Sequence, residues 1–216
     1  MRTVWKTFIA ATAFFLQAYA AESVQYRQLT VAGRLNITVP AHWHVRDANG
    51  RRNIAASAEA ALDPQGKSAE AMHVSSLSVV SSVEKPQVIL RVSVVDEPGS
   101  QEELLNELKR GKTAAIAELA EAWKQEVPRM QQATARQGGR YLGGERFDFV
   151  QLGGKTAMLV SYRRASLTGG APFRVNQYHL PMGQDKLLVT MSVQESAATL
   201  MTPIVDRIRN SISVSK

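Results

Sequence analysis

Alternating apolar and polar positions predict β-strands over much of the chain. In residues 25–46, where we expect two short strands, the alternation is clearest in the run that ends at Pro40: Leu35, Asn36, Ile37, Thr38 and Val39. Residues 87–97 form a second predicted strand region, in which four aliphatic side chains share one face: Val88, Leu90, Val92 and Val94. Both segments are therefore expected to lie in a sheet with a buried face.

Four more strands are predicted in the last third of the chain: residues 145–152, 155–166, 173–180 and 186–194. The segments between them carry turn residues, namely Gly153-Gly154, Gly169-Gly170 and the stretch 181–184. Strands joined by such short turns run antiparallel. Their alternation predicts that one face of the sheet is covered and that the other is largely exposed to water.

A long helix is predicted after the strand at 87–97. Ser100 and Glu103 have the spacing of a capping box, in which each side chain accepts a hydrogen bond from an otherwise unpaired backbone amide. Gly138-Gly139 and Pro128 mark the expected end. Apolar residues at steps of three and four, with Lys112 filling one turn, form a single stripe: Leu105, Leu108, Ile116, Leu119, Trp123, Val127 and Met130.

A second helix is predicted to close the chain. Pro203 fits only a first helical turn, so we expect Thr202 to be the N-cap. Its apolar stripe consists of Met201, Ile204, Val205, Ile208 and Ile212. The predicted fold class is therefore α+β, a twisted antiparallel sheet of about six to seven strands with a long central-sequence helix and a C-terminal helix.

Residues 47–86 give a weaker pattern. Asn49-Gly50 predicts a turn and residues 63–66 predict a loop. The alanine-rich stretch 54–62 fits either a short helix or a strand. The serine- and valine-rich stretch 74–83 fits an edge strand.

The first twenty residues have the layout of a secretory signal peptide. Arg2 and Lys6 precede a short apolar run, and Ala18-Tyr19-Ala20 has the small residues of a cleavage site. The apolar run is short for a permanent span, which needs roughly 20 residues. We expect cleavage near Ala20 and a single mature domain over residues 21–216, located in the periplasm; the alternative is an uncleaved anchor.

Composition agrees with an exported protein that is held together by its own core. The chain has no cysteine, so it has neither disulfides nor a thiol nucleophile. Loss of the two charges of Arg2 and Lys6 lowers the formal net charge from +7 to +5. This balance favours anionic partners, but the basic residues are scattered and few aromatic residues lie among them, so nucleic-acid binding is not predicted. No second segment is apolar enough to span a membrane after cleavage.

The sequence contains no coherent catalytic set, and we predict no catalytic, cofactor-binding or metal-binding residues. His42 and His44 would share a face in an extended segment, but a metal site normally needs three or four ligands. The chain has no Gly-x-Ser-x-Gly nucleophile elbow. Gly138-Gly139 and Gly143-Gly144 lack the Gly-Lys-Ser/Thr ending and the helix of a phosphate-binding loop, so we interpret them as a loop and a turn. The prediction is a protein that is not an enzyme.

A basic group on two adjacent strands is the main candidate for a binding surface. Arg163 and Arg164 end one predicted strand and Arg174 begins the next, with Tyr162 and Tyr178 nearby. A hairpin would bring the three arginines together, where they form either a solvated rim or a docking site for an acidic partner. For Trp123, we expect core packing; a ligand groove between helix and sheet is the alternative.

The whole pattern resembles the Mog1/PsbP-like fold family, which includes the DcrB-type bacterial proteins. The matching features are Pro40 and Trp43 after the opening strand, the strand before the helix capped at Ser100, the run of antiparallel strands and the final Ile208-Arg209-Asn210-Ser211-Ile212. The resemblance covers most of residues 25–214. This chain has His42 where the family often has glycine, and no functional residue is carried over. The resemblance implies a protein that acts by binding other proteins and has no shared catalytic apparatus.

These observations give one leading hypothesis and two alternatives. The first is an exported, non-catalytic periplasmic binding or accessory protein that docks a partner protein. A narrower version is an immunity or chaperone-like protein that neutralises a secreted toxin. The third is a carrier of a lipid or another apolar ligand between helix and sheet.

Overall fold

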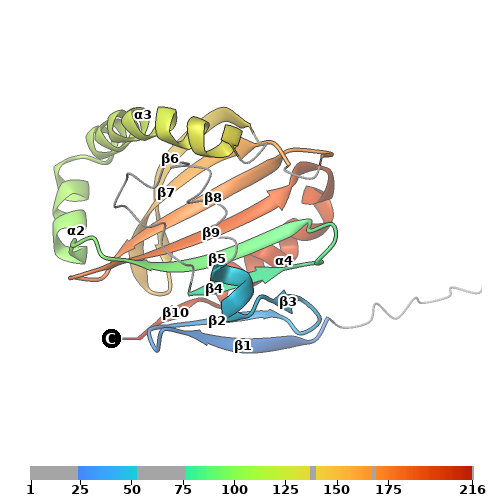
Figure 1. Cartoon of the computed structure of the whole chain (residues 1–216). Coiled ribbons are helices and arrows are strands. Elements are labelled where there is room, and N and C mark those ends of the chain that lie inside the picture. Colours follow the sequence, from blue (N-terminus) through green and yellow to red (C-terminus); the bar gives the residue numbers. More distant parts are fainter. Residues whose placement is uncertain (1–23, 53–75, 137–139, 167–168, 216) are drawn as a thin grey trace, which may run out of the picture.

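The structure is a computed structural model that describes residues 24–52, 76–136, 140–166 and 169–215 (Figure 1). The predicted signal peptide, the alanine-rich stretch 54–62 and the predicted loop at 63–66 lie outside these ranges. The described elements comprise two sheets and helices on both sides of the larger one. The predicted α+β class is confirmed.

The larger sheet has seven strands, and every neighbouring pair is antiparallel. Two helices separate β5 from β6 in the sequence, and the chain returns through three hairpins until β9 pairs with β5. In sheet order the strands are β3 (His44–Val45), β4 (Leu77–Val80), β5 (Val88–Val95), β9 (Lys186–Gln194), β8 (Phe173–Pro181), β7 (Lys155–Arg164) and β6 (Tyr141–Leu152). The strands predicted from the alternation at 87–97 and after residue 145 are all present.

The opening strands belong to a second sheet. β1 (Tyr26–Val31) and β2 (Leu35–Pro40) form a hairpin, and β10 (Ser213–Val214) pairs with the other edge of β2. The chain turns after Pro40, where the Trp43 amide donates to the Pro40 carbonyl, and β3 then joins the larger sheet. The predicted antiparallel sheet of six to seven strands is present, but the opening strands form a separate sheet, because the turn at Pro40 separates β2 from β3.

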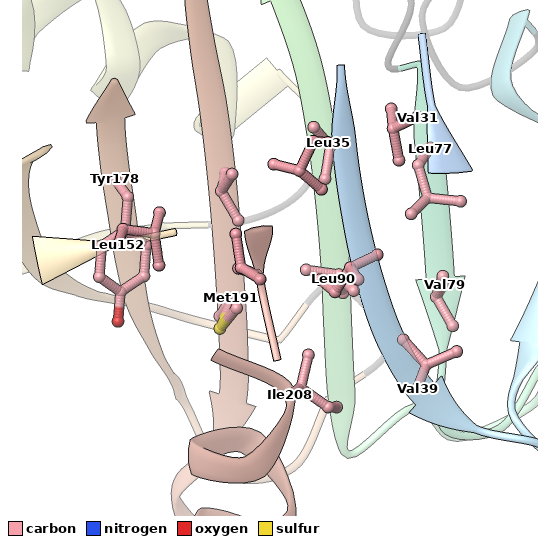
Figure 2. Packing of buried hydrophobic residues seen from close by; sticks show 14 of the residues in the cluster. Val31, Leu35, Val39, Leu77, Val79, Leu90, Leu152, Tyr178, Met191 and Ile208 are labelled. Carbon is pink, nitrogen blue, oxygen red and sulfur yellow. The ribbon is translucent and has the colours of Figure 1, made fainter. Parts of the chain in front are cut away.

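The main core lies between the two sheets and α4 (Ala198–Asn210). Its side chains come from alternating positions of β2, β5 and β9, together with Val205 and Ile208 of α4 (Figure 2). Leu35, Ile37 and Val39 are fully buried, as the alternation predicted. We call this side of the larger sheet, which includes Leu90 and Tyr178, the α4 face.

The opposite side, which we call the α3 face, is covered as well. α2 (Gln101–Arg110) and α3 (Lys112–Arg136) run along it, with α3 against β6 and α2 against β7 (Figure 1). Val160, Phe173 and Val175 alternate with α4-face positions and are buried on this side. The prediction of one largely wet face was therefore wrong, because tertiary packing of the helices buries much of the second face.

The predicted long helix is two helices. Ser100 forms the predicted capping box with Glu103, but Gly111, at φ +151°, ends α2 before α3 starts. The break shifts the phase of the apolar stripe, so Leu104 is 4% exposed and the predicted stripe residue Leu105 is 43% exposed. Trp123 is buried as expected.

Both proline boundaries differ from the prediction. Pro128 lies inside α3, which continues to Arg136. Pro203 lies inside α4, because the short 3₁₀ turn η1 (Glu195–Ala197) starts the helical path earlier. Thr202 is not the N-cap: its hydroxyl donates to the Ala198 carbonyl at 2.7 Å, one turn back. Helix packing thus outweighs the loss of one backbone hydrogen bond at each proline.

Two predictions for residues 47–86 can be compared with the structure. Residues 48–52 are helical, so the turn at Asn49-Gly50 was wrong; the Asp47 carboxylate accepts from the Gly50 amide at 2.6 Å, as an N-cap side chain does. The strand predicted within 74–83 is β4. It is not an edge strand, because the two residues of β3 lie outside it.

Candidate functional site

The β7–β8 hairpin places two of the three predicted arginines side by side. Arg163 is directly opposite Arg174 in the antiparallel register, whereas Arg164 is opposite Phe173. Successive residues of a strand point to opposite faces, so Arg163 and Arg174 lie on the α4 face and Arg164 lies on the α3 face.

The two predicted tyrosines separate in the same way. Tyr178 is four residues from Arg174 and lies on the α4 face, within the main core. Tyr162 is two residues from Arg164 and lies on the α3 face, where its ring contacts Trp123. The five predicted residues therefore do not form one surface, because the two-residue period of the strands divides them between two faces.

Glu195 holds Arg163 in place. Its carboxylate accepts two hydrogen bonds from the Arg163 guanidinium, at 2.6 and 2.8 Å, in the bidentate arrangement typical of this pair. These hydrogen bonds raise the pKa of Arg163 and lower the pKa of Glu195. Arg163 is thus matched by a carboxylate of this chain.

Arg174 is solvated instead. Its side chain is exposed and has no hydrogen-bond or salt-bridge partner in the described part of the chain. Its charge also lies near Glu195, since it contributes to the lowered pKa of that carboxylate. Two arginines therefore share one carboxylate, and this end of the hairpin keeps an excess positive charge.

A small hollow lies further along the same face. It has a volume of about 280 Å³ and is lined by Val150, Gln151, Leu159, Tyr178, Arg209 and Asn210. Between the hollow and the arginines, the Ser161 hydroxyl donates to the Asn176 side-chain oxygen at 2.8 Å. We call the resulting strip the hairpin surface; it consists of Leu159, Ser161 and Arg163 on β7 and Arg174, Asn176 and Tyr178 on β8.

The hairpin surface combines charged and hydrogen-bonding side chains with a small hollow. The hollow is slightly smaller than small-molecule sites, which measure about 300–1,000 Å³, and its size suits a single side chain. Burial raises the pKa of Tyr178, and the charge of nearby Arg209 opposes that rise, so the phenol stays protonated at neutral pH.

Tyr162 and Arg164, the two predicted residues on the α3 face, belong to the packing under α3. Trp123 meets Phe147 edge-on, with ring centroids 6.3 Å apart, and lies 5.6 Å from Tyr162. Its indole nitrogen donates to the Tyr141 hydroxyl at 3.2 Å, and that hydroxyl donates to Glu145 at 2.5 Å. Burial and the hydrogen bond to Glu145 raise the pKa of Tyr141. The expected core role of Trp123 agrees with these contacts.

Arg164 lies above the Phe173 ring, with its guanidinium carbon 4.7 Å from the ring centroid. Burial lowers the pKa of Arg164. This arginine is therefore a packed side chain of the α3 face and is separate from the exposed pair Arg163 and Arg174.

The glycine pairs near Tyr141 have a different role from the one predicted. Gly143 and Gly144, at φ +70° and +77°, lie inside β6 where its register with β7 shifts, so they form a bulge and not a turn between elements. A Cβ at Gly144 would lie 3.5 Å from the Arg163 side chain. A side chain at Gly144 would therefore make only ordinary van der Waals contact with the stem of Arg163, and the positive φ is what favours glycine there. Gly138-Gly139 lies outside the described residues.

The histidine pair near β3 is exposed. Both His42 and His44 lie at the surface, and His44 borders a second hollow of about 280 Å³ with Val45, Arg46, Asp47, Gly50 and Val83. Within the described ranges, no group of three or more His, Cys, Asp or Glu residues is positioned to hold a metal ion.

Sequence reasoning missed Glu195 as the partner of Arg163. The two residues are 32 positions apart and no local motif links them. A signal existed: the register of the β8–β9 hairpin pairs Phe173 with Gln194, so counting across its turn places Glu195 at the same end of the sheet as Arg174. The combined register of several strands brings Glu195 close to Arg163, and no single segment of the sequence shows this.

Comparison with protein-family models gives no match, and comparison with curated proteins gives none either. Among solved structures, the chain is similar to the cyanobacterial PsbP protein CyanoP from Synechocystis sp. PCC 6803, with a TM-score of 0.52, 10% identity and coverage of 91% of this chain and 96% of that one. LpqN of Mycobacterium tuberculosis, described as involved in cell envelope biogenesis, gives 0.40 at 10% identity, covering 89% and 91% of the two chains. The Ran-binding protein Mog1p of Saccharomyces cerevisiae gives 0.38 at 12% identity, covering 89% and 96%. The likeness to CyanoP extends over nearly the whole of both chains, and the chain has the Mog1/PsbP-like fold that its sequence predicts.

Proposed function

We propose that the chain is an exported, non-catalytic binding protein of the periplasm that docks an acidic partner protein through the hairpin surface. The observation that carries this proposal is the excess positive charge at the end of the hairpin, where Arg163 and the exposed Arg174 share only Glu195. Complementary charge accelerates association and excludes wrong partners, and an unpaired exposed arginine can engage a carboxylate of the partner.

The shape of the hairpin surface favours a polypeptide as partner. The arginine pair and the hollow beside Tyr178 are four residues apart along β8, a distance of about 13 Å for a strand. A partner segment could therefore place an acidic side chain on Arg174 and an apolar or aromatic side chain in the hollow. Arginine is also among the side chains enriched where protein interfaces gain their binding energy.

The alternative of an apolar-ligand carrier has less support. Such a carrier needs free apolar space between helix and sheet, and near β6 and β7 the rings of Trp123, Phe147 and Tyr162 are already in contact there. The toxin-neutralising alternative is a special case of protein docking and would use the same surface. No helix within the described ranges is long and apolar enough to cross a membrane.

The export part of the proposal predicts a processed N-terminus. Material isolated from the periplasm is expected to begin at Ala21, or within a residue or two of it, because a signal peptidase would cut after Ala20. Edman sequencing or intact-mass measurement checks this. Protein that is bound to membranes and still starts at Met1 would contradict cleavage and favour the anchor.

The docking part predicts a charge-dependent interaction. Affinity capture from periplasmic extract with wild-type protein is expected to retain an acidic partner whose yield falls as salt is raised. Arg174→Glu is expected to weaken binding of that partner by about tenfold or more, because it replaces attraction by repulsion at an interface charge. The thermal midpoint should change little, since Arg174 is exposed and unpaired in the described part of the chain.

Arg110→Glu is the matched control, with the same charge change at an exposed position in the last turn of α2, on the other side of the sheet. This variant should capture the partner as well as wild type does. Equal loss in both variants would mean that only net charge matters, and full binding by Arg174→Glu would show that the arginine pair is a solvated rim.

A further inference from the structure

A row of polar side chains crosses the middle of the α3 face. Ser78 of β4 pairs with Arg91 of β5, Arg91 pairs with Thr190 of β9, and Thr190 pairs with Gln177 of β8. Paired residues of neighbouring antiparallel strands point to the same side and have adjacent Cβ atoms. These four residues, which we call the Arg91 row, therefore lie next to one another on the inner strands of the sheet.

The Arg91 row ends where α3 packs. The next residues in register are Val160 on β7 and Phe147 on β6, and the Phe147 ring contacts Trp123. The row is thus continuous with the covered part of the α3 face, and α3 and α2 pack mainly on β6 and β7 beside it.

Among the residues that the structure describes, three polar atoms on this face are buried without a hydrogen-bond partner: Ser78 Oγ, Gln177 Oε1 and His179 Nε2. Ser78 is only 1% exposed and is the direct neighbour of Arg91. Such atoms are rare in folded proteins, because a buried donor or acceptor without a partner loses its hydrogen bonds to water without replacement. Two of the three belong to the Arg91 row.

Charge on this face is also unbalanced. The described strands β4, β5, β8 and β9 place no aspartate or glutamate on it; the nearest ion pair, Lys186 with Glu97, lies at the end where β5 and β9 meet the turn at Pro98. The Arg91 side chain is exposed, and the nearby charges of Arg164 and Arg46 add to the positive charge on this face.

We propose that the Arg91 row is a binding site for an oxyanion, the phosphate or carboxylate group of a small ligand. An oxyanion would supply the counter-charge that Arg91 lacks and would accept hydrogen bonds from its guanidinium fork. The hydroxyl of Ser78, the direct neighbour of Arg91, would donate to a remaining oxygen. Gln177 is three strands from Ser78, about 14 Å at the usual spacing of strands, so it borders the other side of Arg91 and does not share the same oxygen. The site is separate from the hairpin surface, which lies on the opposite face of the sheet.

His179 contributes a neutral group at the margin of this site. Burial, together with the charge of Lys186, lowers its pKa to about 4, so the imidazole is uncharged at neutral pH. It lies two residues from Gln177 on the same face of β8 and could donate or accept one hydrogen bond without adding charge.

The test is an NMR titration of the purified protein with two probes, inorganic phosphate and acetate, against sodium chloride at equal ionic strength. The Arg91 side-chain Nε–Hε signal, identified by its loss in Arg91→Gln, is expected to shift in a saturable way with at least one probe and not with chloride. Phosphate binding more tightly than acetate indicates a phosphorylated ligand, and the reverse order indicates a carboxylate.

Two variants make the result decisive. Arg91→Gln is expected to bind the effective probe about tenfold more weakly or worse, since it loses a charge-assisted bidentate contact. Arg110→Gln, with the same charge change at an exposed position in the last turn of α2, should bind it as wild type does. In probe-free buffer Arg91→Gln should be as stable to heat as wild type or more so, because it removes an unneutralised cation.

Three results would overturn the site. One is a wild-type Arg91 signal that responds to neither probe. Another is equal probe affinity in wild type and Arg91→Gln, which would place the binding elsewhere. The third is a large loss of thermal stability in probe-free Arg91→Gln, which would show that the chain itself already neutralises Arg91.

Discussion

Trp123→Ala is expected to lower the free energy of unfolding by about 3–5 kcal/mol, the range for removing a large aromatic side chain from a packed site. The indole is 8% exposed and lies against the rings of Phe147 and Tyr162. The substitution also removes the hydrogen bond from the indole nitrogen to Tyr141. It would leave a cavity exactly where α3 is attached to β6 and β7, so urea denaturation should show a lower midpoint.

Two further variants separate the causes of that loss. Trp123→Phe keeps much of the ring packing but not the hydrogen bond, so it should cost clearly less than Trp123→Ala. Leu105→Ala removes an apolar side chain that is 43% exposed on α2, and it should cost no more than about 0.5 kcal/mol. A loss for Trp123→Ala as small as that of Leu105→Ala would show that this helix face is free to serve as a ligand or partner surface.

The comparison of Leu105 with Leu104 shows where the helix pattern was insufficient. Steps of three and four are compatible with a continuous stripe through residue 111, and the capping box at Ser100 correctly located the helix start. Gly111 breaks the helix with a positive φ, and a stripe drawn through the break assigns the wrong leucine to the core. Local periodicity determines a helix face only within one unbroken helix.

The strands were predicted more completely than the way they assemble. Alternation identified β2, β5 and β9 and their buried residues, because the two-residue period is a local property of each segment. The division into two sheets depends on the turn after Pro40 and on β10, which pairs with β2 from the far end of the chain. Pairings between residues so distant in sequence leave no pattern in either segment.

The candidate site was predicted in part. The hairpin does place Arg163 beside Arg174, as expected from the turn between the strands. The same alternation that identified the strands also implies that Arg163 and Arg164 face opposite sides, and applying it would have separated the two surfaces. Arg91 was overlooked for a related reason: it lies on the face of β5 that was expected to be wet, where an arginine needs no partner.

The attachment of the smaller sheet to the larger one leads to the second large effect. Gly153→Ala is expected to destabilise the protein by about 2–4 kcal/mol, from two sources. Gly153 has φ +60° in the β6–β7 turn, a conformation that costs other residues free energy. An added Cβ would also lie 2.9 Å from a Val214 methyl carbon and 3.3 Å from the Val214 backbone nitrogen, so β10 would have to move.

Gly154→Ala is the matched control for this prediction. Gly154 has φ +80° in the same turn, but no atom lies within 4 Å of its ideal Cβ position. It should therefore show the conformational cost alone, about 1–2 kcal/mol, and the difference between the two variants measures the contact with β10. Chemical denaturation of both proteins gives this difference. Equal losses of unfolding free energy in the two variants would mean that β10 can move aside at no cost in free energy. The turn between β6 and β7 would then not hold the C-terminal strand in place.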